Sequence, residues 1–185
     1  MSTSDNKRAT YSDLEALPGN VIGELIDGEL FALPRPGTPQ GFAAARLFRR
    51  LGAFENPGNA AGWWFLFQPE LHLGDDVLVP DLAGWRGEAL PEQSRPYSTI
   101  TPDWLCEVLS PSTAGIDRTR KLPVYARARV RHVWLLDPLA RTLEVLRRSG
   151  SGWTEAGSFA GEARVRAIPF EAVELDLAAL WPEGG

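Results

Sequence analysis

Two acidic residues stand out because their settings could support metal-assisted hydrolysis. Asp81 lies in the apolar stretch 79–82, and Glu107 interrupts the apolar segment 105–109. A carboxylate in an apolar strand is costly unless it is paired or binds a metal. Mg²⁺ prefers oxygen ligands and commonly takes one or two carboxylates while it keeps several waters. The two acids therefore predict a site for Mg²⁺ or Mn²⁺ at which phosphate oxygens would fill the remaining positions.

Lysine usage adds a third candidate. Of the nineteen basic residues seventeen are Arg, and the only lysines are Lys7, near the amino end, and Lys121. An ammonium on a flexible stem can sit beside an attacking water and a phosphate, a position that suits a planar guanidinium poorly. Asp117, Lys121 and Tyr125 follow at four-residue steps on one face of an expected helix. Lys121 could thus face the Glu107 strand, although a surface ion pair with Asp117 would explain the same spacing.

Glu24 is a candidate third acid near the metal. It begins the segment 24–29, which reads as part of a hairpin. Each acid also has a simpler structural interpretation. Glu24 could be a half-exposed hairpin glutamate, Asp81 a turn or strand-end acid, and Glu107 the buried partner of an arginine.

The elements that must position these residues alternate between strands and helices. The Asp27-Gly28 pair favours a tight hairpin turn, and a strand, helix and strand over residues 104–136 imply a right-handed parallel crossover. We expect helices at 10–17, 38–54 and 113–128 and a short last helix capped by Asp176, with strands at 21–26, 29–33, 64–73, 77–85, 104–109, 132–136, 142–147 and 153–159. The fold class is thus a mixed α/β (α+β) sheet flanked by helices.

The composition suits one folded domain. The chain has 185 residues, of which 44% are hydrophobic and 23% charged, as in ordinary globular proteins. No internal repeat or low-complexity tract interrupts it. We predict a flexible amino end over residues 1–9, a single domain over residues 10–181 and a tail over residues 182–185.

Cysteine usage and hydropathy bound the class of protein further. Cys106 is the only cysteine, and with the two histidines, His72 and His132, it cannot build a zinc site of the Cys/His type. A Cys106–His132 nucleophile pair is formally possible, but the apolar neighbours of Cys106 indicate a core residue. No apolar run approaches the length of a membrane helix, so we expect a cytoplasmic protein.

The motifs, taken together, resemble one family. They are Glu24-Leu-Ile-Asp-Gly-Glu-Leu, Val79-Pro-Asp-Leu, Glu107-Val-Leu-Ser-Pro-Ser-Thr with Asp117, Lys121 and Tyr125, and His132-Val-Trp-Leu-Leu-Asp-Pro. Over residues 11–180 this combination resembles the Uma family of restriction endonucleases, long labelled a domain of unknown function and abundant in bacteria. That family belongs to the PD-(D/E)XK nuclease superfamily, so the resemblance implies a restriction-endonuclease-like fold with a mixed central β-sheet.

The resemblance also implies roles for individual residues. Asp81 and Glu107 would bind the metal, the backbone carbonyl of Val108 would be an additional ligand, and Lys121 would be the catalytic lysine. The superfamily usually places this lysine two positions after the acid, where this chain has Leu109, so the function would have moved to the following helix. The implied reaction is Mg²⁺-dependent hydrolysis of phosphodiester bonds in DNA by an endonuclease, for which two copies of the chain would suit two strands.

The net negative charge of the chain limits how such a nuclease could bind DNA. A net charge of −5 disfavours a protein that coats nucleic acid through overall positive charge. Local arginines would have to hold the polyanion, unless they are merely solvated. The candidates are Arg46, Arg49, Arg50, Arg118 and Arg120.

Two readings compete with the enzyme. Relatives often carry a histidine where this chain has Gln40-Gly41, so a nuclease-fold protein that binds or regulates without cutting is the main alternative. An oligomeric scaffold built on Trp63-Trp64 is a further alternative, although aromatic residues in strands more often belong to the core. Metal binding discriminates, because a scaffold should ignore Mg²⁺ and Mn²⁺.

Overall fold

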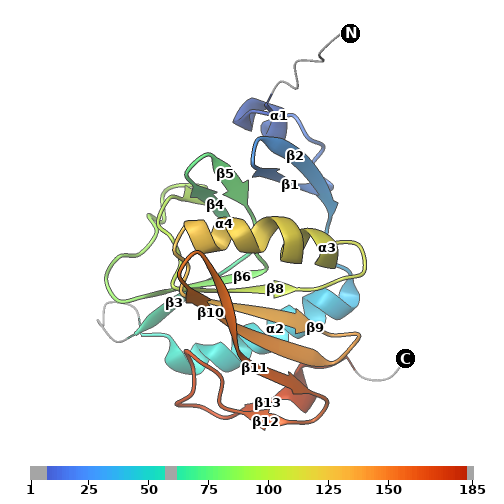
Figure 1. The fold of residues 1–185 in the computed structure, drawn as a ribbon, viewed down its shortest axis with the longest axis vertical. Coiled ribbons are helices and arrows are strands. Elements are labelled where there is room, and N and C mark those ends of the chain that lie inside the picture. The colour runs from blue at the N-terminus through green and yellow to red at the C-terminus, as the bar shows by residue number, and fades with distance from the viewer. Residues whose placement is uncertain (1–7, 57–61, 183–185) are drawn as a thin grey trace.

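A six-stranded mixed sheet forms the centre of the fold (Figure 1). The computed structural model describes residues 8–56 and 62–182. In spatial order the strands are β11 (Gly152–Ala160), β10 (Thr142–Ser149), β9 (His132–Asp137), β8 (Trp104–Val108), β6 (Leu82–Arg86) and β3 (Trp63–Phe67). β8 and β9 run parallel and the other neighbours antiparallel. The predicted parallel crossover is therefore confirmed. Of the flexible amino end expected over residues 1–9 and the tail expected over residues 182–185, residues 1–7 and 183–185 lie outside the described residues.

A second sheet of five strands packs against the first. Its order is β2 (Glu29–Pro34), β1 (Val21–Ile26), β5 (Asp76–Leu78), β4 (Glu70–Leu73) and β7 (Tyr97–Ser98). β1 and β2 form the expected hairpin, whose turn residues Asp27 and Gly28 have positive φ angles of 54° and 82°, as a type I′ turn requires. A small third sheet pairs β12 (Arg164–Val165) with β13 (Leu175–Asp176).

The two long strands expected over residues 64–73 and 77–85 are each broken, so that prediction was wrong. Gln68 has a positive φ of 46° before Pro69, and β3 ends there. Pro80, which has no backbone N–H to donate to a ladder, separates β5 from β6. β3 pairs with β6 in the central sheet, and β4 pairs with β5 in the outer sheet. The predicted hairpin therefore exists but spans both sheets.

The helices lie where the sequence pattern places them. Thr10 caps α1 (Tyr11–Glu15) in a capping box with Asp13. α2 (Thr38–Leu51) continues into a 3-10 turn, η1 (Gly52–Phe54). The helix after β8 consists of α3 (Ala114–Ile116), a π-helical turn η2 (Asp117–Lys121) and α4 (Leu122–Arg127). The last turn, η3 (Leu177–Leu180), is a 3-10 helix to which Asp176 supplies the expected cap.

Two hydrophobic cores lie on the two faces of the central sheet. α2 and the C-terminal segment cover one face, onto which Cys106 and Val108 of β8 point. α4 and the outer sheet cover the other face, which receives Leu105 and Leu109. Side chains alternate along a strand, so Glu107 points toward this second core and interrupts its apolar surface.

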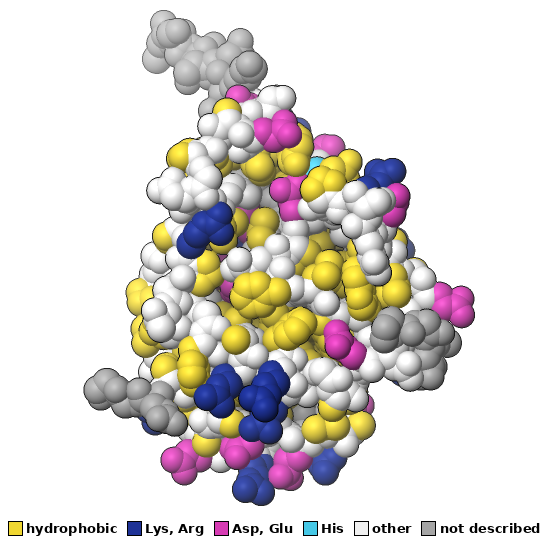
Figure 2. Space-filling view, turned by 180° about the vertical axis from the view of Figure 1, so that it is seen from behind, with side chains coloured by type: hydrophobic (Ala, Val, Ile, Leu, Met, Phe, Trp, Pro, Cys, Tyr) yellow, Lys and Arg dark blue, Asp and Glu magenta, His cyan; other side chains and the backbone are white. Residues whose placement is uncertain are grey.

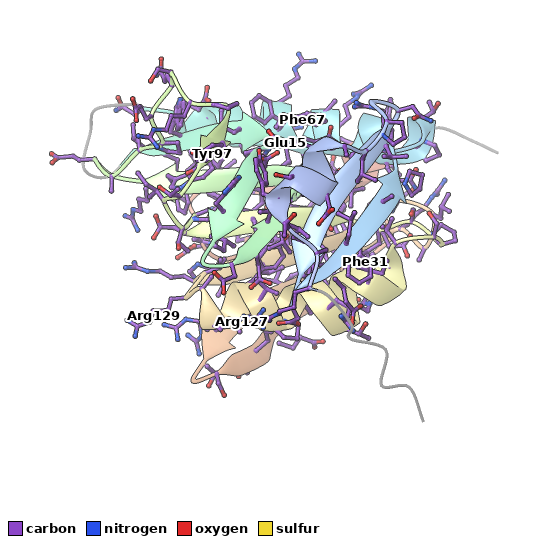
Figure 3. All side chains as sticks on the ribbon, turned by 90° about the horizontal axis from the view of Figure 1, so that it is seen from above. Glu15, Phe31, Phe67, Tyr97, Arg127 and Arg129 are labelled. Atoms are coloured by element: carbon purple, nitrogen blue, oxygen red, sulfur yellow. The ribbon has the colours of Figure 1, made fainter. Side chains whose placement is uncertain are left out.

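Arginines of the α3–α4 helix clamp the β1–β2 hairpin. Arg120 binds Glu29 at 2.8 Å, and its guanidinium carbon lies 5.5 Å from the ring centre of Phe31. Arg127 contacts Asp27 at 2.6 Å. Figure 3 labels Phe31 of the hairpin and Arg127 of the helix, which lie at different points along the boundary between these two elements. The hairpin that carries Glu24 is thus fixed against the helix that carries the lysine.

Candidate active site

Asp81 and Glu107 lie next to each other on one face of the central sheet. Leu82 pairs with Cys106 in the antiparallel register of β6 and β8, which sets position 81 opposite position 107. The backbone N–H of Val108 donates to Oδ2 of Asp81 at 2.8 Å. Asp81 sits at the break between β5 and β6, so the expectation of an acid inside a strand was wrong for Asp81. Glu107, in contrast, lies within β8 and is 3% exposed.

Lys121 joins the acids from the following helix. Its Nζ lies 2.9 Å from Oε1 of Glu24 and 2.9 Å from Oε1 of Glu107. A third contact, to Oδ1 of Asp117, is 3.5 Å long. Lys121 and Asp117 are both buried, so the interpretation of this spacing as a surface ion pair was wrong. The structure instead brings Lys121 to the Glu107 strand, as the helical spacing suggested.

The π-helical turn determines where Lys121 points. The backbone N–H of Leu122 bonds to the carbonyl of Asp117, which is the i→i+5 pattern of a π turn. Pro123 follows immediately and cannot donate to the carbonyl four residues earlier. Such turns recur at functional sites in proteins. The sequence predicted a plain helix here, and Pro123 within an otherwise helical pattern was the available signal for a distortion.

Glu24 reaches the site from the outer sheet and is fully buried, not half-exposed. Its Oε1 accepts a hydrogen bond of 2.8 Å from the backbone N–H of Val79, in addition to the contact with Lys121. Its Oε2 has no partner among the described residues. A buried carboxylate oxygen without a donor is costly, so this oxygen is available to a bound cation.

Tyr125 and Gln40 complete the polar surroundings. Tyr125 is fully buried, and its hydroxyl donates a hydrogen bond to Oε1 of Glu107. The side-chain amide of Gln40, at the start of α2, donates to the carbonyl of Leu109 at 3.4 Å. The four-residue spacing places Tyr125 on the same helix face as Lys121, and the hydrogen bond to Glu107 gives it a role in the site.

The electrostatics of the cluster follow from burial and from an excess of acid. Burial raises the pKa of Glu107 well above its usual value. The charges of the surrounding acids raise this pKa further, whereas the charge of Lys121 lowers it. Burial likewise raises the pKa of Asp81, although the hydrogen bond from the backbone of Val108 lowers it in part. For Lys121 burial alone would lower the pKa, but the charges of Glu107 and Glu24 prevail and raise it well above the ordinary value. Lys121 therefore stays an ammonium.

These side chains line one cavity of about 380 Å³. Its polar wall contains Glu24, Gln40, Asp81, Glu107, Val108, Asp117 and Lys121. Four carboxyl groups line this cavity together with two cations, the ammonium of Lys121 and the guanidinium of Arg35, and hard oxygen donors are the ligands that Mg²⁺ prefers. Across residues 8–56 and 62–182, no group of three or more His, Cys, Asp or Glu side chains is arranged so that it could hold a metal ion. Two acids with waters remain a sufficient donor set for Mg²⁺, and the unpartnered oxygen of Glu24 agrees with a cation there.

The Cys106–His132 pair is not assembled. Cys106 is fully buried on the opposite core face, and burial raises the pKa of its thiol. In the β8–β9 register it lies opposite Trp134, while His132 lies opposite Trp104. Cys106 is thus the core residue that its neighbours indicated.

The candidate arginines separate into two groups. Arg118 pairs with Glu144, and Arg120 pairs with Glu29, so carboxylates already neutralise both. The remaining three are exposed along α2 and are Arg46, Arg49 and Arg50.

The mixed central sheet with helices on its faces is consistent with a restriction-endonuclease-like fold. Among solved structures, this chain is similar to one described as "a putative nuclease belonging to DUF820 from Anabaena variabilis ATCC 29413". The two share 21% sequence identity with a TM-score of 0.75, over 93% of this chain and 97% of that one.

The chain belongs to the Uma2 family, described as "Putative restriction endonuclease", whose family profile matches residues 9–178. No curated protein matches the chain. Within residues 8–56 and 62–182, no helix is both long enough and apolar enough to cross a membrane.

Proposed function

We propose that this protein is a divalent-metal-dependent endonuclease that hydrolyses phosphodiester bonds in DNA. The observation that carries the proposal is the contact of Lys121 with Glu24 and Glu107, beside Asp81, in one cavity. These residues come from both sheets and from the α3–α4 helix. Membership of the Uma2 family supports the same class of reaction.

Asp81 and Glu107 are the residues that would hold Mg²⁺ or Mn²⁺, with the backbone carbonyl of Val108 as a further donor. A bound divalent ion supplies Lewis-acid polarisation of a phosphate oxygen and a lower pKa for its water. The hydrogen bond from Val108 to Asp81 keeps one oxygen of that carboxylate fixed. This hydrogen bond therefore fixes the position of the Asp81 carboxylate relative to the strand that carries Glu107, without a bound metal.

Lys121 acts as a fixed positive charge in this proposal. Because its pKa is raised well above the ordinary value, it orients a water and stabilises negative charge on the phosphate instead of accepting a proton. Glu24 and Asp117 hold the ammonium in place. Tyr125 holds the oxygen of Glu107 that also contacts Lys121.

One observation favours the second candidate, a nuclease-fold protein that binds without cutting. Gln40 lines the cavity at the position where the family resemblance implies a histidine, and it is 6% exposed. Its amide is engaged by the carbonyl of Leu109 and cannot transfer a proton at neutral pH. If the reaction needs an acid or base at this position, this chain would bind DNA without hydrolysing it.

The experiment that decides is cleavage of supercoiled plasmid and of single-stranded DNA by the purified protein with Mg²⁺ or Mn²⁺. The variants are Asp81→Asn, Glu107→Gln and Lys121→Met, with Glu155→Gln on β11 as an exposed control. We expect cleavage by the wild type and the control, and at least a hundredfold loss in the other three. An inert wild type that also binds no Mn²⁺ in calorimetry would establish the non-cutting module instead.

We further propose that the enzyme acts in the bacterial cytoplasm and cuts duplexes as a homodimer. The single buried thiol agrees with a reducing compartment. A two-fold pair of active sites matches the two strands of a duplex. Sedimentation of the protein with and without duplex DNA measures its assembly.

A further inference from the structure

We infer that α2 carries a nucleic-acid strand away from the active-site cavity to a second cavity, which holds a flanking nucleotide. This inference rests on the proposed function, because it takes DNA as the substrate. It adds where the strand lies beyond the scissile phosphate and which side chains hold it there.

The second cavity lies at the C-terminal half of α2 and has a volume of about 550 Å³. Arginines of α2 form one wall, and apolar or aromatic side chains form much of the rest. The lining residues that matter here are Arg46, Arg49, Arg50, Phe54, Phe170 and Val173. A cationic wall beside an apolar one suits a nucleotide, whose phosphate is anionic and whose base is apolar on both faces.

The three arginines of this wall have no ion pair with a carboxylate among the described residues, whereas Arg118 and Arg120 each do. Arg46 instead lies over the ring of Phe42, with its guanidinium carbon 4.7 Å from the ring centre. The one acid in the cavity wall, Glu174, lies 3.6 Å from Arg164. Uncompensated guanidinium groups in a chain of net charge −5 indicate a site for an external anion.

Helix geometry connects this wall to the active site. Pro39 lines the active-site cavity, and Arg46 and Arg50 line the second one. At 3.6 residues per turn, steps of seven and eleven residues return to the same side of a helix, so the three share one face. Along the axis Arg46 lies about 10 Å and Arg50 about 16 Å beyond Pro39. Those distances correspond to the rise of about three and five base pairs along the axis of B-form DNA.

Figure 2 looks onto the side that carries α2, behind the central sheet of Figure 1, and shows an apolar area with basic side chains gathered below it. A guanidinium can bind a phosphate through two parallel hydrogen bonds. Phosphates repeat along a strand at a constant spacing, which matches cations repeated along a helix. The occupant that fits is therefore a nucleic-acid backbone and not an isolated small anion.

The test measures binding of a fluorescein-labelled 20-base-pair duplex by anisotropy, in EDTA so that no cleavage occurs, over a series of salt concentrations. The test variant is Arg46→Gln/Arg50→Gln. The control is Arg86→Gln/Arg147→Gln, which removes the same charge from two exposed arginines on β6 and β10. We expect the test variant to bind about tenfold more weakly at low salt. The slope of log K against log salt should fall by about one for each arginine removed, and the control should match the wild type.

Three outcomes would overturn the inference. The first is equal affinity and equal salt slope for the test variant and the wild type. The second is an equal loss in the control, which would show that only total charge matters. The third is competition by poly-glutamate as strong as that by unlabelled duplex, which would show a general polyanion surface. If any of these occurs while Lys121→Met still abolishes cleavage, the nuclease proposal stands and only the α2 path fails.

Discussion

The backbone N–H of Val108 donates a hydrogen bond of 2.8 Å to Oδ2 of Asp81. Val108 directly follows Glu107 on β8. The strand that carries one acid therefore also orients the other, although the two acids come from segments far apart in the chain. The position of Asp81 relative to Glu107 therefore depends on the pairing of β6 with β8.

The first prediction concerns the pH dependence of stability. Burial raises the pKa of Asp81 above its usual 3.8 in the folded protein. Between the unfolded and the folded pKa the native state binds more protons than the unfolded state, so the free energy of unfolding falls as pH rises through that window. Asp81→Asn should remove this contribution and flatten the curve. Urea unfolding from pH 4 to pH 8 measures it.

A bound cation favours the carboxylate form, so Mg²⁺ should restore stability to the wild type at the upper end of that range and do less for Asp81→Asn. Parallel curves for the two proteins, with and without Mg²⁺, would contradict the assignment of Asp81 to the buried metal-binding pair.

The second prediction concerns the ammonium of Lys121. Lys121→Met keeps the length of the side chain but leaves Glu24 and Glu107 without their shared cation. Breaking a buried ion pair by removing one partner costs about 3–5 kcal/mol. We expect a loss of that order in urea at pH 8 and a smaller loss at pH 5, because the pKa of Glu107 is raised well above its usual value and its carboxylate is protonated more readily there. Equal losses at both pH values would mean that packing, not charge, is responsible.

The third prediction separates positioning from packing at Tyr125. Tyr125→Phe keeps the ring but removes the hydroxyl that donates to Glu107. Losing a donor to the carboxylate should raise the pKa of Glu107 further. The acidic limb of the pH–rate profile for cleavage should therefore move to higher pH, with the protein still folded. Tyr97→Phe, on β7, is the matched control, and an unchanged profile for Tyr125→Phe would show that the hydroxyl does not tune Glu107.

The fourth prediction tests the pairing of β3 with β6. A Cβ on Gly84 would lie 2.8 Å from the ring of Phe65, its partner across the two strands. Gly84→Ala should destabilise the protein by about 1–3 kcal/mol through overpacking. Gly41→Ala, in α2 with nothing within 4 Å of the new Cβ, should be neutral or stabilise by up to about 1 kcal/mol. Thermal unfolding of both variants provides the comparison, and similar shifts would argue against the close contact.

Local signals in the sequence were sufficient for much of the framework. Asp27-Gly28 predicted the first hairpin, and the spacing of Asp117 and Lys121 placed the lysine on the correct helix face. These features depend on residues within a few positions of each other. The out-of-pattern Glu107 was also visible, because a charge in an apolar strand stands out whatever surrounds it.

Other features depended on contacts between distant segments and could not be read locally. The full burial of Glu24 was not visible in its local sequence, because Glu24 is buried by contacts with Val79 and with Lys121 of the α3–α4 helix, which are distant in the chain. The breaks at Gln68 and Pro80 did have a local signal, because Pro69 and Pro80 interrupt runs that are otherwise long enough for single strands. What the periodicity does not reveal is that the two halves of each run join different sheets, because that depends on pairing with other strands.

The position of Asp81 at a strand break has a mechanical consequence. Glu24 belongs to the outer sheet and Glu107 to the central sheet, and Asp81 lies in the short connection between β5 and β6. Any rotation of one sheet upon the other changes the separation of these carboxyl groups. The relative placement of the carboxyl groups therefore depends on how the two sheets pack, so a substitution between the sheets, away from the cavity, would change the distances within the site.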